Sequence, residues 1–154
     1  MITKELVLAL ALISTQLQAN DWRSAVQAEI EHVFYGRYVD KQSIKTLTVR
    51  YSPEADGMGI RCDKSRARIT FGKSLVLHFQ YDTHVVATVL AHELGHCQQA
   101  LKDSIQNELA ADMYGLKLYT NTGGTVAEYV QRFIDRDDPG SRTHPSDRAR
   151  VRLL

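Results

Sequence analysis

The segment Ala91–His96, which reads Ala-His-Glu-Leu-Gly-His, constrains the fold of this chain more than any other feature. His92 and His96 are four residues apart, so on a helix their imidazoles lie on one face and can bind one metal ion. The pattern is typical of zinc sites in which the carboxylate after the first histidine accepts a proton from water. We therefore predict a helix that carries His92 and His96 as zinc ligands and Glu93 as a general base.

The residues before this motif are apolar and predict a buried helix that begins at Asp82 or Thr83. The apolar run includes Val85, Val86, Val89 and Leu90. Gly95, between the two histidines, lowers helix propensity by about 1 kcal/mol relative to alanine. Two interpretations of Gly95 stay open: it allows close approach of a backbone or substrate, or it is a tolerated glycine.

A third metal ligand is expected from the segment Asn107–Asp112. Glu108 and Asp112 are one helical turn apart, and the alanines between them allow this helix to pack closely on the first. Glu108 as third ligand leaves the fourth zinc position to water. Asp112 is then expected to accept a hydrogen bond from the second ring nitrogen of a histidine ligand, which fixes its tautomer.

Three segments in this order, His92–His96, Glu108–Asp112 and Thr143–Ser146 with Arg148, resemble metallopeptidase family forty-eight. This family is the group of gluzincins that includes the HtpX, Oma-type and CAAX prenyl proteases. The resemblance implies an α+β zincin-like domain, a zinc endopeptidase activity, Glu108 as third ligand and Asp112 as its supporting acid. The membrane-embedded members carry transmembrane helices around the catalytic domain, and this sequence shows no segment of that kind. The chain is therefore more similar to the small soluble members of bacterial envelopes.

His144 and Arg148 are the candidates for stabilising charge at the reacting carbonyl. Pro145 suits the start of a helix and leaves His144 just outside it. In a peptidase the attacked carbonyl acquires negative charge, so His144 is expected to donate a hydrogen bond there, with Arg148 as the second candidate. Alternatively, His144 occupies the fourth zinc position and holds the enzyme latent, or the segment only packs the last helix.

The first residues, Met1–Ala19, have the character of a secretory signal peptide. The apolar run Leu6–Ile13 is too short to span a bilayer, and Leu17-Gln18-Ala19 fits a cleavage site. An uncleaved anchor or an amphipathic helix is the alternative. We expect residues 20–154 to form one domain in the periplasm or outside the cell.

The two cysteines, Cys62 and Cys97, would both remain in an exported chain. In an oxidising compartment such a pair is expected to form a disulfide. The alternative is that Cys97 is a small buried hydrophobic residue on the metal-binding helix.

Hydrophobic spacing predicts the remaining elements. We expect a helix over residues 21–38, a strand over 43–51, a loop over 54–59, and helices over 104–119 and 125–136. Residues 66–71 alternate basic and apolar side chains, which we interpret as an edge strand beside the site. Together with the family resemblance, this predicts that a substrate adds to it as a further strand.

Charge adds little to the prediction of function. The formal net charge is +1, which gives no indication of a nucleic-acid surface. The carboxy-terminal arginines, which are Arg142, Arg148, Arg150 and Arg152, are expected to form a solvated helix face. The predicted function is an exported zinc endopeptidase acting on proteins or peptides, without stable membrane insertion once the signal is removed. A zinc-containing binding module or chaperone, or an accessory protease dedicated to one envelope partner, is the alternative.

Overall fold

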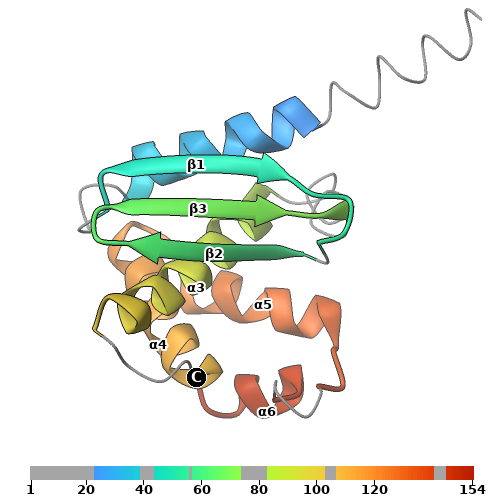
Figure 1. The fold of residues 1–154 in the computed structure, drawn as a ribbon. Helices are drawn as coiled ribbons and strands as arrows, with labels where there is room; N and C mark the ends of the chain where they lie inside the picture. The colour runs from blue at the N-terminus through green and yellow to red at the C-terminus, as the bar shows by residue number, and fades with distance from the viewer. Residues whose placement is uncertain (1–22, 39–43, 56, 74–82, 103–106, 141–144) are drawn as a thin grey trace, which may run out of the picture.

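The computed structural model describes residues 23–38, 44–55, 57–73, 83–102, 107–140 and 145–154. The predicted signal peptide and His144 lie outside the described residues. A helix over residues 23–33 continues into the π-helical turn η1 (Phe34–Tyr38). The strands are β1 (Thr46–Tyr51), β2 (Met58–Asp63) and β3 (Arg66–Phe71), and the later helices are α3 (Thr83–Leu101), α4 (Glu108–Asn121), α5 (Val126–Arg136) and α6 (Asp147–Val151) (Figure 1).

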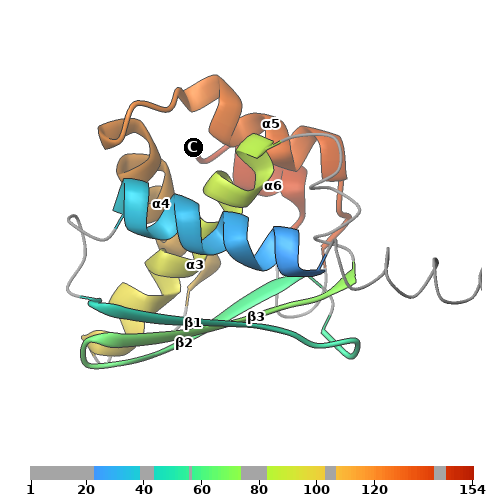
Figure 2. The ribbon, with the colours of Figure 1, turned by 90° about the horizontal axis from the view of Figure 1, so that it is seen from above.

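The three strands form one sheet in the order β1-β3-β2, with β1 parallel and β2 antiparallel to β3. Val49, Ile69 and Ile60 are aligned across the sheet and point to the same side. The helices that the structure describes all lie on this apolar side, and no described element covers the other face of the sheet, which we call the bare face (Figure 2). The α+β class is therefore confirmed, with a core between one sheet face and the helices.

The prediction that residues 66–71 form an edge strand is wrong. These residues are β3, the central strand, and the edge strand packed beside α3 is β2. Alternation of basic and apolar residues reports that the two faces of a strand differ, and says nothing about whether its edges are paired. The strand β2 is missing from the predicted elements: its first residues, Met58 and Gly59, belong to the predicted loop, and residues 60–63 to no predicted element. The pattern of a strand is nevertheless present, because Met58, Ile60 and Cys62 alternate with polar residues or glycine.

Two helix boundaries show how local chemistry sets the elements. The predicted helix over residues 104–119 begins only at Glu108, because the side-chain oxygen of Asn107 caps it by accepting from the N–H of Ala110 at 3.0 Å. Thr125 and Glu128 form a reciprocal capping box that starts α5. The predicted buried helix around the histidine motif is confirmed: Leu90, Ala91 and Leu94 of α3 are fully buried.

Candidate metal centre

Helix α3 presents His92 and His96 on one face, as the four-residue spacing predicts. Their Nε2 atoms are 3.1 Å apart. His92 and Glu93 are buried, and His96 is half-buried. The two imidazoles therefore converge on one point at the border of the core.

Glu108, the first residue of α4, completes the group. Its Oε2 lies 3.4 Å from Nε2 of His92, and its Oε1 lies 3.4 Å from Nε2 of His96. Two atoms bound tetrahedrally at about 2.0–2.1 Å from one ion lie about 3.3 Å apart. The geometry fits a single four-coordinate metal ion, and His92, His96 and Glu108 could hold one. We call these three residues the metal group.

Two glycines bring the ligands of α3 and α4 this close. A Cβ on Gly95 would lie 2.5 Å from the carbonyl oxygen of Ala111, and one on Gly115 would lie 2.9 Å from the backbone of His92. Each glycine therefore lets the backbones of α3 and α4 approach to a distance that a side chain would prevent. For Gly95, the first of the two interpretations is confirmed, and the neighbour is the backbone of α4.

Asp112 lies behind His92, one turn after Glu108. Its Oδ1 is 2.8 Å from Nδ1 of His92, and because a carboxylate only accepts, the imidazole N–H donates. This leaves Nε2 of His92 with its lone pair directed at Glu108 and His96. The predicted contact between Asp112 and a histidine ligand is present in the structure.

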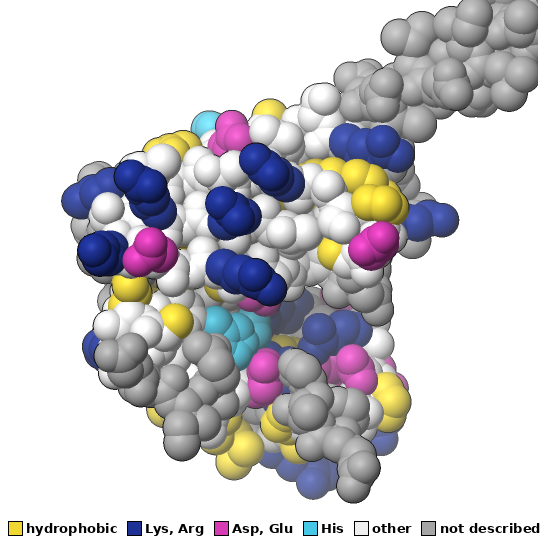
Figure 3. Space-filling model, viewed as in Figure 1, with side chains coloured by type: hydrophobic (Ala, Val, Ile, Leu, Met, Phe, Trp, Pro, Cys, Tyr) yellow, Lys and Arg dark blue, Asp and Glu magenta, His cyan; other side chains and the backbone are white. Residues whose placement is uncertain are grey.

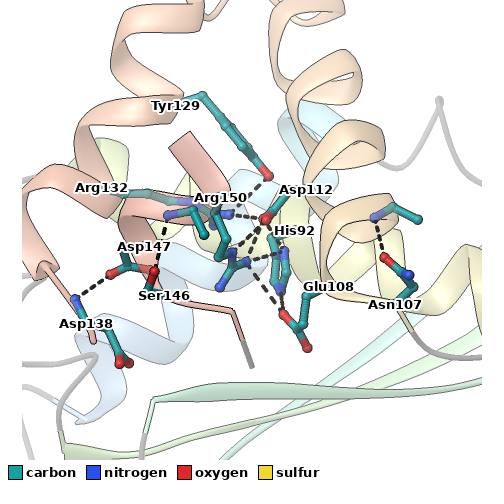
Figure 4. A network of polar contacts seen from close by, with 12 residues as sticks. His92, Asn107, Glu108, Asp112, Tyr129, Arg132, Asp138, Ser146, Asp147 and Arg150 are labelled. Atoms are coloured by element: carbon teal, nitrogen blue, oxygen red, sulfur yellow. Dashed lines mark hydrogen bonds and ion pairs between the residues drawn. The ribbon is translucent and has the colours of Figure 1, made fainter. Parts of the chain in front are cut away.

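Two arginines that sequence reasoning did not connect with the metal site surround Asp112 (Figure 4). Arg150 of α6 donates from Nε to Oδ2 and from Nη2 to Oδ1, both at 2.6 Å. Arg132 of α5 donates to Oδ1 at 2.8 Å, and its other terminal nitrogen donates to the carbonyl of Thr88 at 2.9 Å. Asp112, which is 0% exposed, therefore carries bonds from three helices.

The sequence held a signal for one of these arginines. Arg132 lies three residues after Tyr129 and directly before Phe133, both of which are buried, so it occupies the apolar face of α5. Its guanidinium lies 4.4 Å from the centre of the Tyr129 ring and 4.2 Å from that of Phe133. An arginine on an apolar face needs a buried anion, and Asp112 is that anion.

The structure reverses the expectations for two arginines: Arg150, expected to be solvated, lies at the site, and Arg148, expected as a candidate at the reacting carbonyl, is exposed. Arg148 is 79% exposed at its side chain and pairs with Asp137 at 3.1 Å, away from the metal group. Arg150 is buried, and its Nη2 lies 3.6 Å from Oε2 of Glu108. The expectation that Arg150 belongs to a solvated face is wrong, and the position of Arg148 gives no support to a role at the reacting carbonyl.

Helix α6 is short, and ionic contacts position it. Ser146 caps its first turn by accepting from the N–H of Ala149 at 3.2 Å. The next residue, Asp147, is buried and accepts from the guanidinium of Arg136 and from the N–H of Asp138 at 2.8 Å. These contacts hold α6 against α5 so that Arg150 reaches Asp112.

Burial and charge shift the pKa values of the three carboxylic acids in opposite directions. Burial raises the pKa of Glu93 above its ordinary value. Burial also acts on Glu108 and Asp112, but the close contacts of Glu108 with His92 and His96, and the hydrogen bonds from His92 and Arg150 to Asp112, outweigh it and lower both pKa values. Glu108 and Asp112 are therefore ionised at neutral pH, as a metal ligand and its support require.

Cys62 of β2 and Cys97 of α3 are paired, with their Cα atoms 5.4 Å apart. This separation is usual for a disulfide. The pair joins the edge strand to the residue after His96. Among the described residues no cysteine is left free.

Two further findings bear on the wider predictions. In the part of the chain that the structure describes, no helix has both the length and the apolar character needed to cross a membrane. Comparisons with protein-family models, with curated proteins and with solved structures gave no match for this chain. The family resemblance of the motifs therefore stays a prediction, and the case for function rests on the geometry of the metal group.

Proposed function

We propose that this chain is an exported zinc-dependent endopeptidase. The observation that carries the proposal is the group of His92, His96 and Glu108, whose ligand atoms lie 3.1–3.4 Å apart beside Glu93. Two imidazoles and one carboxylate form the ligand set of catalytic zinc sites that keep a fourth position for water. A structural zinc site has four protein ligands and needs no acid beside one of them.

The residues around the metal group suit peptide hydrolysis. A bound zinc ion would lower the pKa of a water molecule and polarise the peptide carbonyl. Glu93 would accept a proton from such a water molecule and deliver it to the leaving amine. Its buried position, which raises its pKa, favours uptake of the proton. Asp112 keeps the proton of His92 on Nδ1, so that Nε2 stays free to bind metal.

The edge of β2 that pairs with no other described strand is the place where a peptide substrate would bind. β2 is an edge strand that packs against α3, and Cys62 joins it to Cys97 one residue after the ligand His96. A peptide that adds to this edge gains main-chain hydrogen bonds with little demand on its sequence. The role that the sequence suggested for residues 66–71 is thereby assigned to β2.

Export is supported by the cysteine pair and by the signal-like sequence of Met1–Ala19. Disulfides persist mainly in oxidising compartments such as the periplasm and the cell exterior.

Cleavage of unfolded casein by the zinc-loaded protein tests the proposal. Glu93→Gln should retain zinc and lose at least about a hundredfold in rate, because general acid–base catalysis contributes about 10²–10⁴. Glu54→Gln, which changes an exposed glutamate in the loop after β1, is the matched control and should cut like the wild type. Zinc binding without cleavage by any of the three proteins would contradict the endopeptidase activity and favour a binding module.

A further inference from the structure

The bare face of the sheet is strongly basic. Nine side-chain positions of the three strands point to this face, and they comprise four arginines, three threonines, one glycine and one aspartate. The arginines are Arg50, Arg61, Arg66 and Arg68, and all four are exposed. Exposed lysines, Lys45 and Lys64, extend the same charge at the strand ends. We define these six residues as the basic face (Figure 3).

This concentration of charge is not a property of the whole chain. The net charge of the protein is only +1, so the residues outside the basic face are net negative. Among the residues that the structure describes, the side chains of these four arginines form no hydrogen bond or ion pair. The face therefore projects a positive field toward solvent.

Arg66 of the basic face lies opposite Asp63, but another of its cross-strand pairs is unfavourable to the sheet. Arg61 and Arg68 are aligned directly across the β2–β3 pair. Side chains at such positions are neighbours, and like charges placed there destabilise a sheet. Nothing in the fold requires this pair, because a threonine or glutamine would satisfy the same exposed positions. A surface that reduces stability in this way indicates a partner that neutralises it.

We propose that the basic face binds the surface of a bilayer rich in anionic phospholipids. Guanidinium groups match phosphate oxygens in geometry and charge, and clusters of four to eight basic residues bind anionic lipid surfaces. The outward residues of the strands include no aromatic or large apolar side chain, whereas such residues anchor protein interfaces and stack on single-stranded nucleic acids. A bilayer surface needs neither anchor.

Bound in this way, the protein holds its metal group close to the membrane surface. The edge of the basic face is β2, which packs on α3, and histidine lies in a recess beside the sheet (Figure 3). The metal group would open at the border of the docked face, accessible to chains that emerge from the bilayer or lie along it. This inference does not depend on the proposed enzymatic activity.

Vesicle co-sedimentation of the full chain tests the proposal. The probes are vesicles of phosphatidylcholine mixed with phosphatidylglycerol, and vesicles of phosphatidylcholine alone, which record any binding by the apolar run Leu6–Ile13. The face variant combines Arg50→Gln, Arg61→Gln and Arg68→Gln. The matched control combines Lys117→Gln, Arg148→Gln and Arg152→Gln, which remove the same charge from exposed positions on or just after α4 and α6.

Wild type should bind the anionic vesicles at low salt, and the face variant should bind roughly a hundredfold more weakly, because each basic residue contributes about fivefold. The control should stay within a few-fold of wild type. The face variant should also unfold at no lower denaturant concentration than wild type, because it removes the Arg61–Arg68 repulsion. Failure of wild type to bind anionic vesicles, equal weakening of both variants, or binding to soluble polyglutamate in place of vesicles would overturn the proposal.

Discussion

Two pairs of helices contribute to the metal centre in different ways. The α3–α4 pair supplies the three side chains that could hold a metal ion, and its backbones meet at Gly95 and Gly115 without an intervening side chain. The α5–α6 pair supplies no ligand and reaches the centre through the long side chains of Arg132 and Arg150. Backbone packing therefore sets the spacing of His92, His96 and Glu108. The arginine side chains from α5 and α6 hold Asp112, the acid that orients His92.

The two pairs also differ in what holds them together. Apolar residues and close backbone contact join α3 to α4, whereas α6 has only five residues and is attached to α5 through the buried Asp147. A contact between closely packed backbones is sensitive to added volume, and a buried ionic contact is sensitive to the removal of one charge. Variants that change only charge or only volume should therefore separate the two pairs.

The largest effect is expected from Asp112→Asn, which removes the charge that α5 and α6 share. Two buried arginines would lose their anion, and removal of one partner from a buried ionic group costs about 3–5 kcal/mol. Zinc affinity should fall about 10- to 100-fold, because His92 loses the carboxylate that orients it. Urea unfolding of the metal-free protein and chelator competition measure the two effects.

Asp137→Asn is the control for this change, because Asp137 pairs with the exposed Arg148. It should alter the free energy of unfolding by at most about 1 kcal/mol. Equal effects of the two substitutions would show that the cluster around Asp112 has no special role.

Gly95→Ala tests the backbone contact between α3 and α4 by adding volume without charge. The new methyl group would meet the backbone of Ala111 at 2.5 Å, so α4 would have to move. We expect a loss of about 1–3 kcal/mol in the free energy of unfolding, and weaker zinc binding because Glu108 moves with α4.

Gly36→Ala is the matched control, since a Cβ at Gly36 would meet nothing within 4 Å. There the substitution should leave stability unchanged or raise it by up to about 1 kcal/mol. A stable Gly95→Ala protein with normal zinc affinity would contradict the close-contact explanation.

The contact between α5 and α6 should depend on pH through Asp147. Burial raises the pKa of Asp147, but hydrogen bonds from Arg136 and from the backbone of Asp138 outweigh it, so the folded pKa lies below the ordinary value. Its stabilising effect is complete above the unfolded pKa of about 4 and is lost as the pH falls through the folded pKa. The difference in unfolding free energy between wild type and Asp147→Asn should therefore be largest at neutral pH and shrink in acid.

This difference should be smaller than the effect of Asp112→Asn, because Arg136 is partly exposed. Urea titrations of the metal-free proteins across the acid range measure it. A difference that grows as the pH falls would contradict the assigned ion pair.

The smallest effect is expected from Arg148→Ala. Its ion pair with Asp137 is exposed, so stability should change by no more than about 1 kcal/mol and zinc affinity should stay the same. Arg150→Ala, two residues away, should resemble Asp112→Asn. If the two arginine variants had equal effects, the burial of Arg150 would not matter to the centre.

The parts of the site that could be predicted from the sequence are those whose contacting residues are close together along the chain. The grouping of His92 with His96 follows from helical spacing alone, and the alanines around Glu108 indicated a second helix in close contact. Arg150 could not be assigned in this way. Its partner Asp112 is 38 residues earlier, and the exposed Arg148 has the same sequence neighbourhood.

The sheet illustrates a second limit. Alternation in Arg66–Phe71 correctly predicted a strand with one buried face, but strand order depends on pairing between segments. Gly57, just before β2, and Gly59 within it favour a loop over a strand. The pairing of β2 with β3 outweighs that local preference.

X-ray absorption at the zinc edge of the zinc-loaded protein tests directly whether His92, His96 and Glu108 bind zinc. We expect one zinc ion per chain, with nitrogen and oxygen neighbours at about 2.0–2.2 Å from these three residues, and no sulfur neighbour. Glu108→Ala should remove one oxygen neighbour from this shell and weaken binding. Sulfur at about 2.3 Å, or a protein that does not bind zinc, would contradict the account.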